Sequence, residues 1–512
     1  MLLYTKELVA PRANFSQGLQ RFKAQRLRQK YEKMLYKAFA HSTIHGIQNA
    51  FEERHIYARY FWLIVVLLGM LGMLGMFSVL KQQHTEQQLV SVVETTQFPV
   101  YNIEFPAVAI CPFNHVNWLR ASTAQHRFMP RNADSYVRES FHQLLVRMEQ
   151  LNFGKFQTLG GLSKRNMTAL ANVSLVKLAS YLAYRCDELF VPDSCFFDET
   201  RYECCQLFVS ERTEKGICLV FNSLISEESS KKKLVNEFYP YKLSTAGEGS
   251  GLKFMLRLND TFLRAGTQVP FSMNLMIKES NEWSNTMNYH LYANTENFVS
   301  VDPLVIQTSK NTDIMDPVKR RCYFENERHP DYPYKNLPYS RSNCIFSCLQ
   351  ASVQFYCNCS MPLYLPVIDD TRECSVLDFP CLHHHTDVFG YVKTLDQDTH
   401  IKDSRRGQLC SCPDSCNVQL YQTYLNVRHL NYFNTTNTTI PKRIKAEIYY
   451  SQRVLMKIET KLKYSFVDLV AGFGGILGLY MGASTLSFIE LGYIVSQLLS
   501  LLKDAYVKLT SK

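Results

Sequence analysis

The cysteines constrain the fold of this chain more than any other feature. All sixteen lie between Cys111 and Cys416 of a 512-residue sequence, and ten of them lie within residues 322–416. Disulfides persist in oxidising compartments and are rare in the cytosol, so an even number of cysteines confined to one region is typical of an extracellular domain. The sequence therefore predicts up to eight disulfides, although the spacing alone does not determine which cysteines pair.

Two long apolar stretches flank this region. Residues 61–80 contain no charged side chain, and a helix of about 20 residues crosses a ~30 Å hydrocarbon core. Residues 464–502 contain only two charged side chains, Asp468 and Glu490. The first apolar run follows 60 mostly polar residues, which is too late for a cleaved signal peptide. We therefore predict a transmembrane helix at 61–80 and a second transmembrane segment at 464–502.

The distribution of positive charge predicts the orientation of both segments. Residues 1–60 carry 11 Lys and Arg against 4 Glu, and residues 503–512 carry three Lys and one Asp. Positive flanks stay in the cytoplasm, so we expect a plasma-membrane protein with both termini cytoplasmic and residues 81–463 extracellular. The net charge of +10 is mostly this signal and does not indicate nucleic acid binding. The basic run at 21–37 fits either anionic lipid binding or an ordinary cytoplasmic flank.

Glycosylation sequons agree with this topology, because they share the predicted extracellular region with the cysteines. The candidate acceptors are Asn166, Asn172, Asn259, Asn358, Asn434 and Asn437.

Local patterns predict a mixed α and β extracellular region. Apolar residues at helical spacing predict helices at 141–151 and 173–183. Alternating or β-rich runs predict strands at 98–111, 252–258, 271–277, 298–306 and 418–427, and residues 431–439 form a polar loop.

The second apolar stretch is too long for a simple span. Its 39 residues would form a helix of roughly 58 Å, so it must tilt, project or break. The expected break is Gly482-Ala483-Ser484, whose backbone carbonyls could face a passing cation. A small-residue packing seam explains the glycines equally well. The spacing leaves both interpretations open for Ala471, Gly475, Gly478 and Gly482.

The two carboxylates in this stretch also have two interpretations. Glu490 is costly beside a membrane unless it faces water or a partner, and a ring of such residues in an oligomer would attract cations. It could instead be an interfacial residue at the cytoplasmic edge. The same choice applies to Asp468 at the outer edge.

The pore sequence resembles that of a known family. Residues 473–490, FGGILGLYMGASTLSFIE, resemble the pore region of the degenerin/epithelial sodium channels. His45-Gly46 before the first span, the segment at 105–111 after it, and Cys410-x-Cys412-x3-Cys416 also resemble family motifs and occur in the family's order. The short termini and the cysteines at 186–218 are most similar to the insect pickpocket branch.

The resemblance implies a fold and a function. It implies an α+β membrane protein with two transmembrane helices, a palm β-sheet, finger and thumb helices and a β-ball, assembled as a homo- or heterotrimer. It implies an amiloride-sensitive type of sodium channel subunit, gated by an extracellular ligand or stimulus and sensory in role. Gly482, Ala483 and Ser484 would form the selectivity filter, and the pore and gating residues would be Ala471, Gly475, Gly478, Glu490, Asp468, His45 and Gly46. The implied partners are sodium ions, the lipid bilayer, same-family subunits and an unidentified extracellular ligand.

The resemblance also implies a set of disulfides. The thumb, residues 322–416, would contain Cys322–Cys416, Cys344–Cys412, Cys348–Cys410, Cys357–Cys381 and Cys359–Cys374, and Cys111 would pair with Cys218. Of the remaining four cysteines, Cys195 is expected to pair with Cys204 or Cys205, and the partner of Cys186 stays open.

Two departures from the family pattern limit what is carried over. Gly472 stands where the family usually has an acidic residue or Asn, which puts inherited details of ion preference and block in doubt. Acid-sensing relatives have a tryptophan shortly before the first thumb cysteine, and this chain has none there, so proton gating is not implied.

Other function classes have less support. A two-pass adhesion or co-receptor protein would share the disulfide-rich domain but would not need a Gly-Ala-Ser segment or Glu490. No Ser/His/Asp arrangement, metal-ligand spacing or phosphate loop supports an enzyme or a cofactor. The run His383-His384-His385 could bind metal or respond to pH, or it could be a solvated loop.

Overall fold

The computed structural model divides the chain into two compact units. It describes residues 29, 33, 36 and 43–510, except for 87–88, 268–270, 284–287, 328, 331, 333–337, 365–370, 394–405 and 431–441. One unit comprises Met1–Val90 and Leu462–Lys512, and the other comprises Ser91–Lys461. The chain therefore leaves the first unit once and returns to it once.

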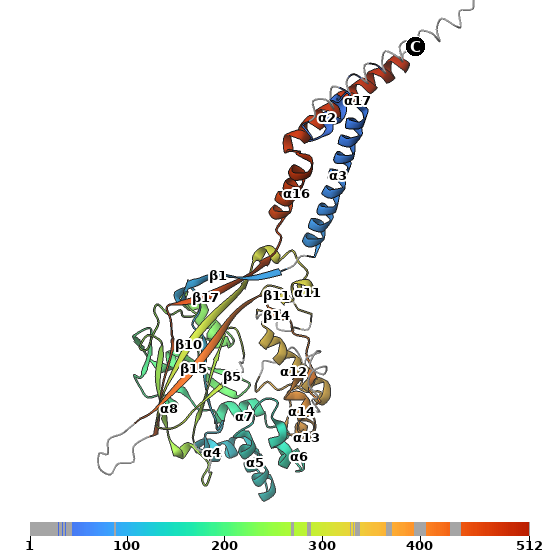
Figure 1. Ribbon diagram of the computed structural model, residues 1–512. Helices are drawn as coiled ribbons and strands as arrows, with labels where there is room; N and C mark the ends of the chain where they lie inside the picture. Colours follow the sequence, from blue (N-terminus) through green and yellow to red (C-terminus); the bar gives the residue numbers. More distant parts are fainter. Residues whose placement is uncertain are drawn as a thin grey trace, which may run out of the picture. The chain divides into compact units, whose positions relative to one another are not determined.

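The first unit is helical. Helix α3, Ile56–Thr85, includes the predicted span at 61–80 and continues for several polar residues beyond it. Among the described residues it is the one helix that is long and apolar enough to cross a membrane by itself. Helices α16, Phe466–Met481, and α17, Thr485–Thr510, pass that test only as a pair, bent by 73° at the break between them. Helices α3 and α16 lie side by side, and Phe77 meets Phe473 edge to face at 5.3 Å (Figure 1).

An eight-stranded sheet dominates the second unit, and its long strand β10, Thr295–Thr308, is central to it. Along one edge β10 pairs in parallel first with β16, Lys442–Tyr450, and then with β17, Val454–Leu462. Along its other edge it pairs antiparallel with β15, Asn417–His429 (Figure 1). The remaining strands are β1, Leu89–Pro99, beside β17, and β7, Leu252–Leu258, β3, Cys195–Phe197, and β4, Thr200–Tyr202, beyond β16.

A smaller five-stranded sheet packs with the eight-stranded sheet around one hydrophobic core. Its order is β5, Phe208–Thr213, β6, Gly216–Phe221, β2, Ala107–Pro112, β8, Met273–Lys278, and β9, Asn288–Leu291. Phe105, Phe221 and Tyr450 are fully buried, and the Phe105 ring lies 5.3 Å from that of Tyr450. Aromatic side chains from both sheets thus form one core.

Most helices of the second unit gather beside the sheets (Figure 1), and they bury a separate hydrophobic core. Helix α5, Ser135–Met148, begins at Asp134, whose carboxylate accepts a hydrogen bond from the Val137 N–H at 2.7 Å. Its face of Phe141, Leu144 and Leu145 is fully buried. The other helices that contribute to this core include α4, Ala121–Phe128, α7, Leu175–Leu182, α12, Arg341–Cys357, α13, Phe379–His384, and α14, Thr386–Phe389.

Eight disulfides account for all sixteen cysteines. The five thumb bridges and Cys111–Cys218 have the pairing that the family resemblance implied. The alternatives left open by the sequence are resolved as Cys195–Cys204 and Cys186–Cys205.

One strand prediction was wrong. Residues 98–111 do not form a single strand, because Pro99 ends β1, a 3-10 turn follows at Val100–Asn102, and β2 starts only after Pro106. The predicted loop at 431–439, with Asn434 and Asn437, and most of the basic run at 21–37 lie outside the described residues. The four described sequon asparagines, at 166, 172, 259 and 358, are exposed.

Candidate functional site

The break between α16 and α17 coincides with Gly482-Ala483-Ser484. Gly482 has φ +62°, in the left-handed region, and its N–H donates to the Gly478 carbonyl at 3.0 Å. The Ala483 N–H donates to the Leu477 carbonyl at 3.4 Å. A left-handed glycine with these returning hydrogen bonds is a common way to end a helix.

Ser484 and Ser487 cap the start of α17. The Ser484 N–H donates to Ser487 Oγ at 3.1 Å, and the Ser487 N–H donates to Ser484 Oγ at 3.4 Å. Such reciprocal side-chain bonds satisfy N–H groups that a first helical turn leaves unpaired. Both sides of the break are therefore stabilised locally, and Ser484 remains exposed.

A segment from the other end of the chain lies against this break. The His45 N–H donates to the Met481 carbonyl at 2.9 Å, and a Cβ at Gly482 would overlap the His45 ring. The Thr43 hydroxyl lies 2.8 Å from Ser487 Oγ and 3.2 Å from Glu490 Oε2. The predicted gating motif, the predicted filter and the predicted acidic residue thus meet in one place.

The next residue, Gly46, anchors this segment to the first long helix. Gly46 has φ +82°, and a Cβ there would lie 2.9 Å from Val66 of α3. Helix α2, Ile47–Glu52, follows directly. The His45-Gly46 pair therefore lies between two elements: Gly46 contacts α3, and His45 contacts the break between α16 and α17.

The glycines of α16 belong to two different surfaces. In the contact between the two helices, Gly472 of α16 faces Leu80 of α3. On the α3 side, Gly69 and Gly72 face Tyr480 of α16. By contrast, a Cβ at Gly475 or Gly478 would meet nothing within 4 Å, and Ala471 is exposed. The predicted stripe of Ala471, Gly475 and Gly478 is therefore not the packing seam with α3.

Asp468 has a structural partner in the first turn of α16. The N–H and hydroxyl of Ser465 donate to its carboxylate at 2.9 and 2.8 Å, and the Asp468 N–H donates back to Ser465 Oγ at 3.2 Å. This is a capping box, which stabilises the helix start whether or not an ion is near.

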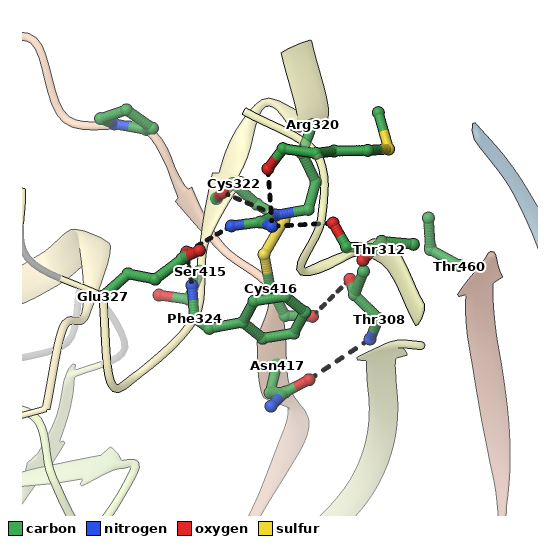
Figure 2. Close-up of a disulfide and its surroundings, with 12 residues drawn as sticks. Thr308, Thr312, Arg320, Cys322, Phe324, Glu327, Ser415, Cys416, Asn417 and Thr460 are labelled. Carbon is green, nitrogen blue, oxygen red and sulfur yellow. Dashed lines mark hydrogen bonds and ion pairs between the residues drawn. A yellow bond between two sulfur atoms is a disulfide. The ribbon is translucent and has the colours of Figure 1, made fainter. Parts of the chain in front are cut away.

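In the second unit, the thumb joins the central sheet at the Cys322–Cys416 disulfide (Figure 2). The N–H and hydroxyl of Thr308, the last residue of β10, donate to the Cys416 carbonyl at 3.1 and 2.8 Å. The Ser309 N–H donates to the Thr460 carbonyl of β17 at 2.8 Å. The Cys322–Cys416 bridge is thus hydrogen-bonded through Cys416 to the end of β10, and the residue after β10 is hydrogen-bonded to β17.

Arg320 fixes the short segment that leads into this disulfide (Figure 2). Its guanidinium is fully buried and donates to the carbonyls of Thr312 at 3.0 Å and Cys322 at 3.2 Å. It also forms an ion pair with Glu327 and lies over the Phe324 ring at 4.4 Å. Sequence reasoning missed this residue, although Arg320 and Glu327 closely flank the first thumb cysteine.

A cavity of about 380 Å³ lies beside this junction. Its lining includes Glu104, Glu279 and Glu325 together with Lys233 and Lys457. Burial, and then the neighbouring carboxylate of Glu282, raise the pKa of Glu279 to about 8. The Gln419 N–H donates to Glu279 and partly offsets this shift.

The histidine run lies at the end of α13 and just after it, not in a loop. His383 packs against Gly160, and the His385 ring stacks on Tyr356 with centroids 4.7 Å apart. Within the part of the chain that the structure describes, no cluster of His, Cys, Asp or Glu is arranged to hold a metal ion.

Comparisons with known proteins place the chain among channels. The sequence matches the family described as amiloride-sensitive sodium channel over residues 38–494. Pickpocket protein 19 of Drosophila melanogaster is 51% identical over 511 residues, 99% of each chain. Sodium channel protein Nach of Drosophila ananassae is 23% identical over 90% of this chain and 86% of its own length. A solved proton-activated chloride channel aligns with 85% of this chain and 99% of its own at 8% identity, but the TM-score of 0.26 supports no argument.

Proposed function

The chain belongs to the amiloride-sensitive sodium channel family, in its pickpocket branch, and we propose that it conducts sodium through a pore lined by Gly482-Ala483-Ser484. Members of this family are ion channels and not enzymes. A non-conducting adhesion or co-receptor protein is not favoured, because it would not require this segment.

The helix break carries the proposal. Non-helical backbone at membrane depth is tolerated only where it faces protein or a water-filled path. His45 and Thr43 provide protein contacts on one side of the break, while Ser484 stays exposed in the single chain. A water-filled path past Ser484 would satisfy the remaining backbone groups and would present carbonyls and hydroxyls to sodium.

The channel would be a homo- or heterotrimer of same-family subunits. One subunit cannot enclose a pore, and the face of Ala471, Gly475 and Gly478 that α3 leaves open would line the central axis. In this arrangement α3 and the α16–α17 pair are the two spans, both termini are cytoplasmic, and residues 81–463 are extracellular and glycosylated. Three copies of Glu490 would lie near the cytoplasmic end of the path and attract cations.

Gating would begin in the extracellular region, in response to a ligand or another sensory stimulus. The thumb is bonded to Thr308 of β10, and the residue that follows Thr308 bonds Thr460 of β17. Strand β17 ends at Leu462, only four residues before α16 begins. A displacement at the thumb base could therefore reach the pore helix through the hydrogen bonds to β10 and β17 and then through the short chain segment between β17 and α16.

The test is ion selectivity at Ser484. We expect Ser484→Ala and Ser484→Thr to change the relative permeability of sodium, potassium and caesium, because the hydroxyl lines the narrowest site. Threonine keeps a hydroxyl oxygen that can cap α17. The Ser484→Thr variant should therefore fold like wild type and report the effect on selectivity alone. Ser496→Ala, on an exposed part of α17, is the matched control. Unchanged reversal potentials in both Ser484 variants would contradict the proposal.

A further inference from the structure

Two adjacent cysteines, Cys204 and Cys205, form bridges of very different accessibility. Cys204 and its partner Cys195 are buried, at 5% and 0% exposure. Cys205 is the one exposed cysteine of the sixteen, all of which the structure describes, and its partner Cys186 is half-buried. A sulfur must be reached by solvent before an external thiol can attack it.

A cleft of about 310 Å³ lies against the Cys186–Cys205 bridge. Both cysteines line it, and so do the hydroxyl-bearing residues Ser180 and Ser210. The exposed residues Arg185 and Glu228 also line it. The cleft therefore offers a positive group for a carboxylate and a negative group for an ammonium beside an accessible disulfide.

We propose that Cys186–Cys205 is an exchange site for small extracellular thiols of the cysteine and glutathione class. A thiolate that enters the cleft attacks the sulfur of Cys205, a new S–S bond forms between them, and Cys186 leaves as a thiolate that takes up a proton. A second thiolate can then displace Cys205 from the mixed disulfide. The net reaction reduces the bridge to two thiols and oxidises two external thiols to one disulfide.

The surrounding structure holds the region together when the bridge opens. Cys186 begins the short helix α8, Cys186–Leu189, and Arg257 donates to the carbonyls of Asp187 at 2.7 Å and Glu188 at 3.2 Å. The Glu188 carboxylate also pairs with Arg120. On the other side, the buried Cys195–Cys204 bridge still holds α9, Cys204–Leu207. The exchange is therefore local and reversible.

The first experiment identifies the cysteines that react. The full chain in cell membranes is treated with millimolar glutathione, blocked with N-ethylmaleimide, and digested for mass spectrometry. We expect glutathione on Cys205 and alkylation of Cys186 at levels at least about tenfold above the other fourteen cysteines. Earlier opening of another bridge, or equal labelling of all cysteines, would overturn the proposal. The double variant Cys186→Ser/Cys205→Ser should lose both products.

The second experiment tests recognition of the thiol by the cleft. We expect Arg185→Gln to slow the reaction with glutathione several-fold and to leave the reaction with neutral 2-mercaptoethanol unchanged, because only the charged thiol uses the guanidinium. Glu227→Gln, exposed and outside the cleft lining, is the matched control. If both thiols keep their rates, or both slow equally, the assigned ligand class is wrong. These readouts are chemical, so they are independent of whether the protein conducts sodium.

Discussion

At the scale of single residues, Gly482 tolerates no side chain for two independent reasons. Its φ of +62° costs a residue with a Cβ about 1–2 kcal/mol, and the added methyl group would overlap the His45 ring. We expect Gly482→Ala to reduce sodium current per channel at the cell surface by tenfold or more, because the His45 segment must move. Gly492→Ala in α17, where the methyl group meets open space in the chain and which lies outside the proposed pore-lining face, is the control for helix composition. Wild-type current in Gly482→Ala would show that the contact is unimportant.

A second residue, Glu279, should make stability depend on pH. Its folded pKa of about 8 lies above the ~4.3 of an unfolded glutamate, so the folded state holds a proton that the unfolded state lacks between these values. Its stabilising contribution is complete below about pH 4 and is lost as pH rises to about 8.

We therefore expect Glu279→Gln to flatten the decrease in melting temperature between pH 5 and pH 8, because glutamine stays neutral. Thermal unfolding of the purified chain at several pH values measures this. Glu237→Gln removes an exposed carboxylate and should leave the slope unchanged. An identical slope in wild type and Glu279→Gln would exclude Glu279 as the titrating group.

Residue patterns in the sequence identified some site residues and missed others for a physical reason. Gly482 and Glu490 stood out because a Gly-Ala-Ser segment and a carboxylate lie within a long apolar stretch, whereas His45 was identified only by its resemblance to a family motif. Their meeting depends on contacts between residues more than 430 positions apart, such as Thr43 with Glu490, and no local pattern encodes those. Arg320 was missed because a single arginine beside a cysteine has no periodicity.

At the scale of elements, segment length and the residues at turns helped to predict the helix break, whereas the pairing of strands could not be predicted from the sequence. An unbroken helix in the second apolar stretch would be about twice the membrane thickness, so the length required a tilt, a projection or a break, and the Gly-Ala-Ser segment indicated where a break would fall. The strand at 98–111 was overextended because its apolar content masked two prolines. The placement of β16 and β17 end to end along β10 was not predictable, since the pairing joins segments about 150 residues apart.

The thumb base gives an element-scale prediction. Arg320→Met should lower the free energy of unfolding of the thumb by about 3 kcal/mol, because it leaves the partly buried Glu327 without its cation. Limited proteolysis of the full chain, followed by peptide mapping, should detect earlier cleavage within residues 322–416. The control variant Lys319→Met changes an exposed neighbouring residue and should be cleaved at the same rate as wild type. The double variant Arg320→Met/Glu327→Gln should recover part of the loss, and equal sensitivity of the double and single variants would argue against the ion pair as the cause.

At the scale of the whole molecule, the proposed pore requires surfaces from more than one chain. The small-residue face of α16 opposite α3 carries exposed Ala471 and two glycines without neighbours. Exposed small residues on an apolar helix permit close approach of another helix. In the proposed trimer, three such faces meet at the axis, so the size of the residue at 471 controls how closely the helices approach.

Ala471 therefore provides the prediction that tests the assembly. Closing the pore brings three copies of this residue together near the outer end of α16, where a methyl group fits and a phenyl group does not. Added volume in a packed contact costs ~1–3 kcal/mol or more, and here the cost falls on the closed state because the open pore has room. A shift of that size moves a two-state equilibrium by roughly five- to over a hundredfold. We expect Ala471→Phe to give a constitutive sodium current that is toxic to cells bathed in sodium, while Ala471→Ser, similar in size to wild type, stays closed at rest. The measurement is resting current normalised to surface protein, and a surface-delivered Ala471→Phe channel without resting current, in a wild type shown to conduct, would reject the convergence of these faces.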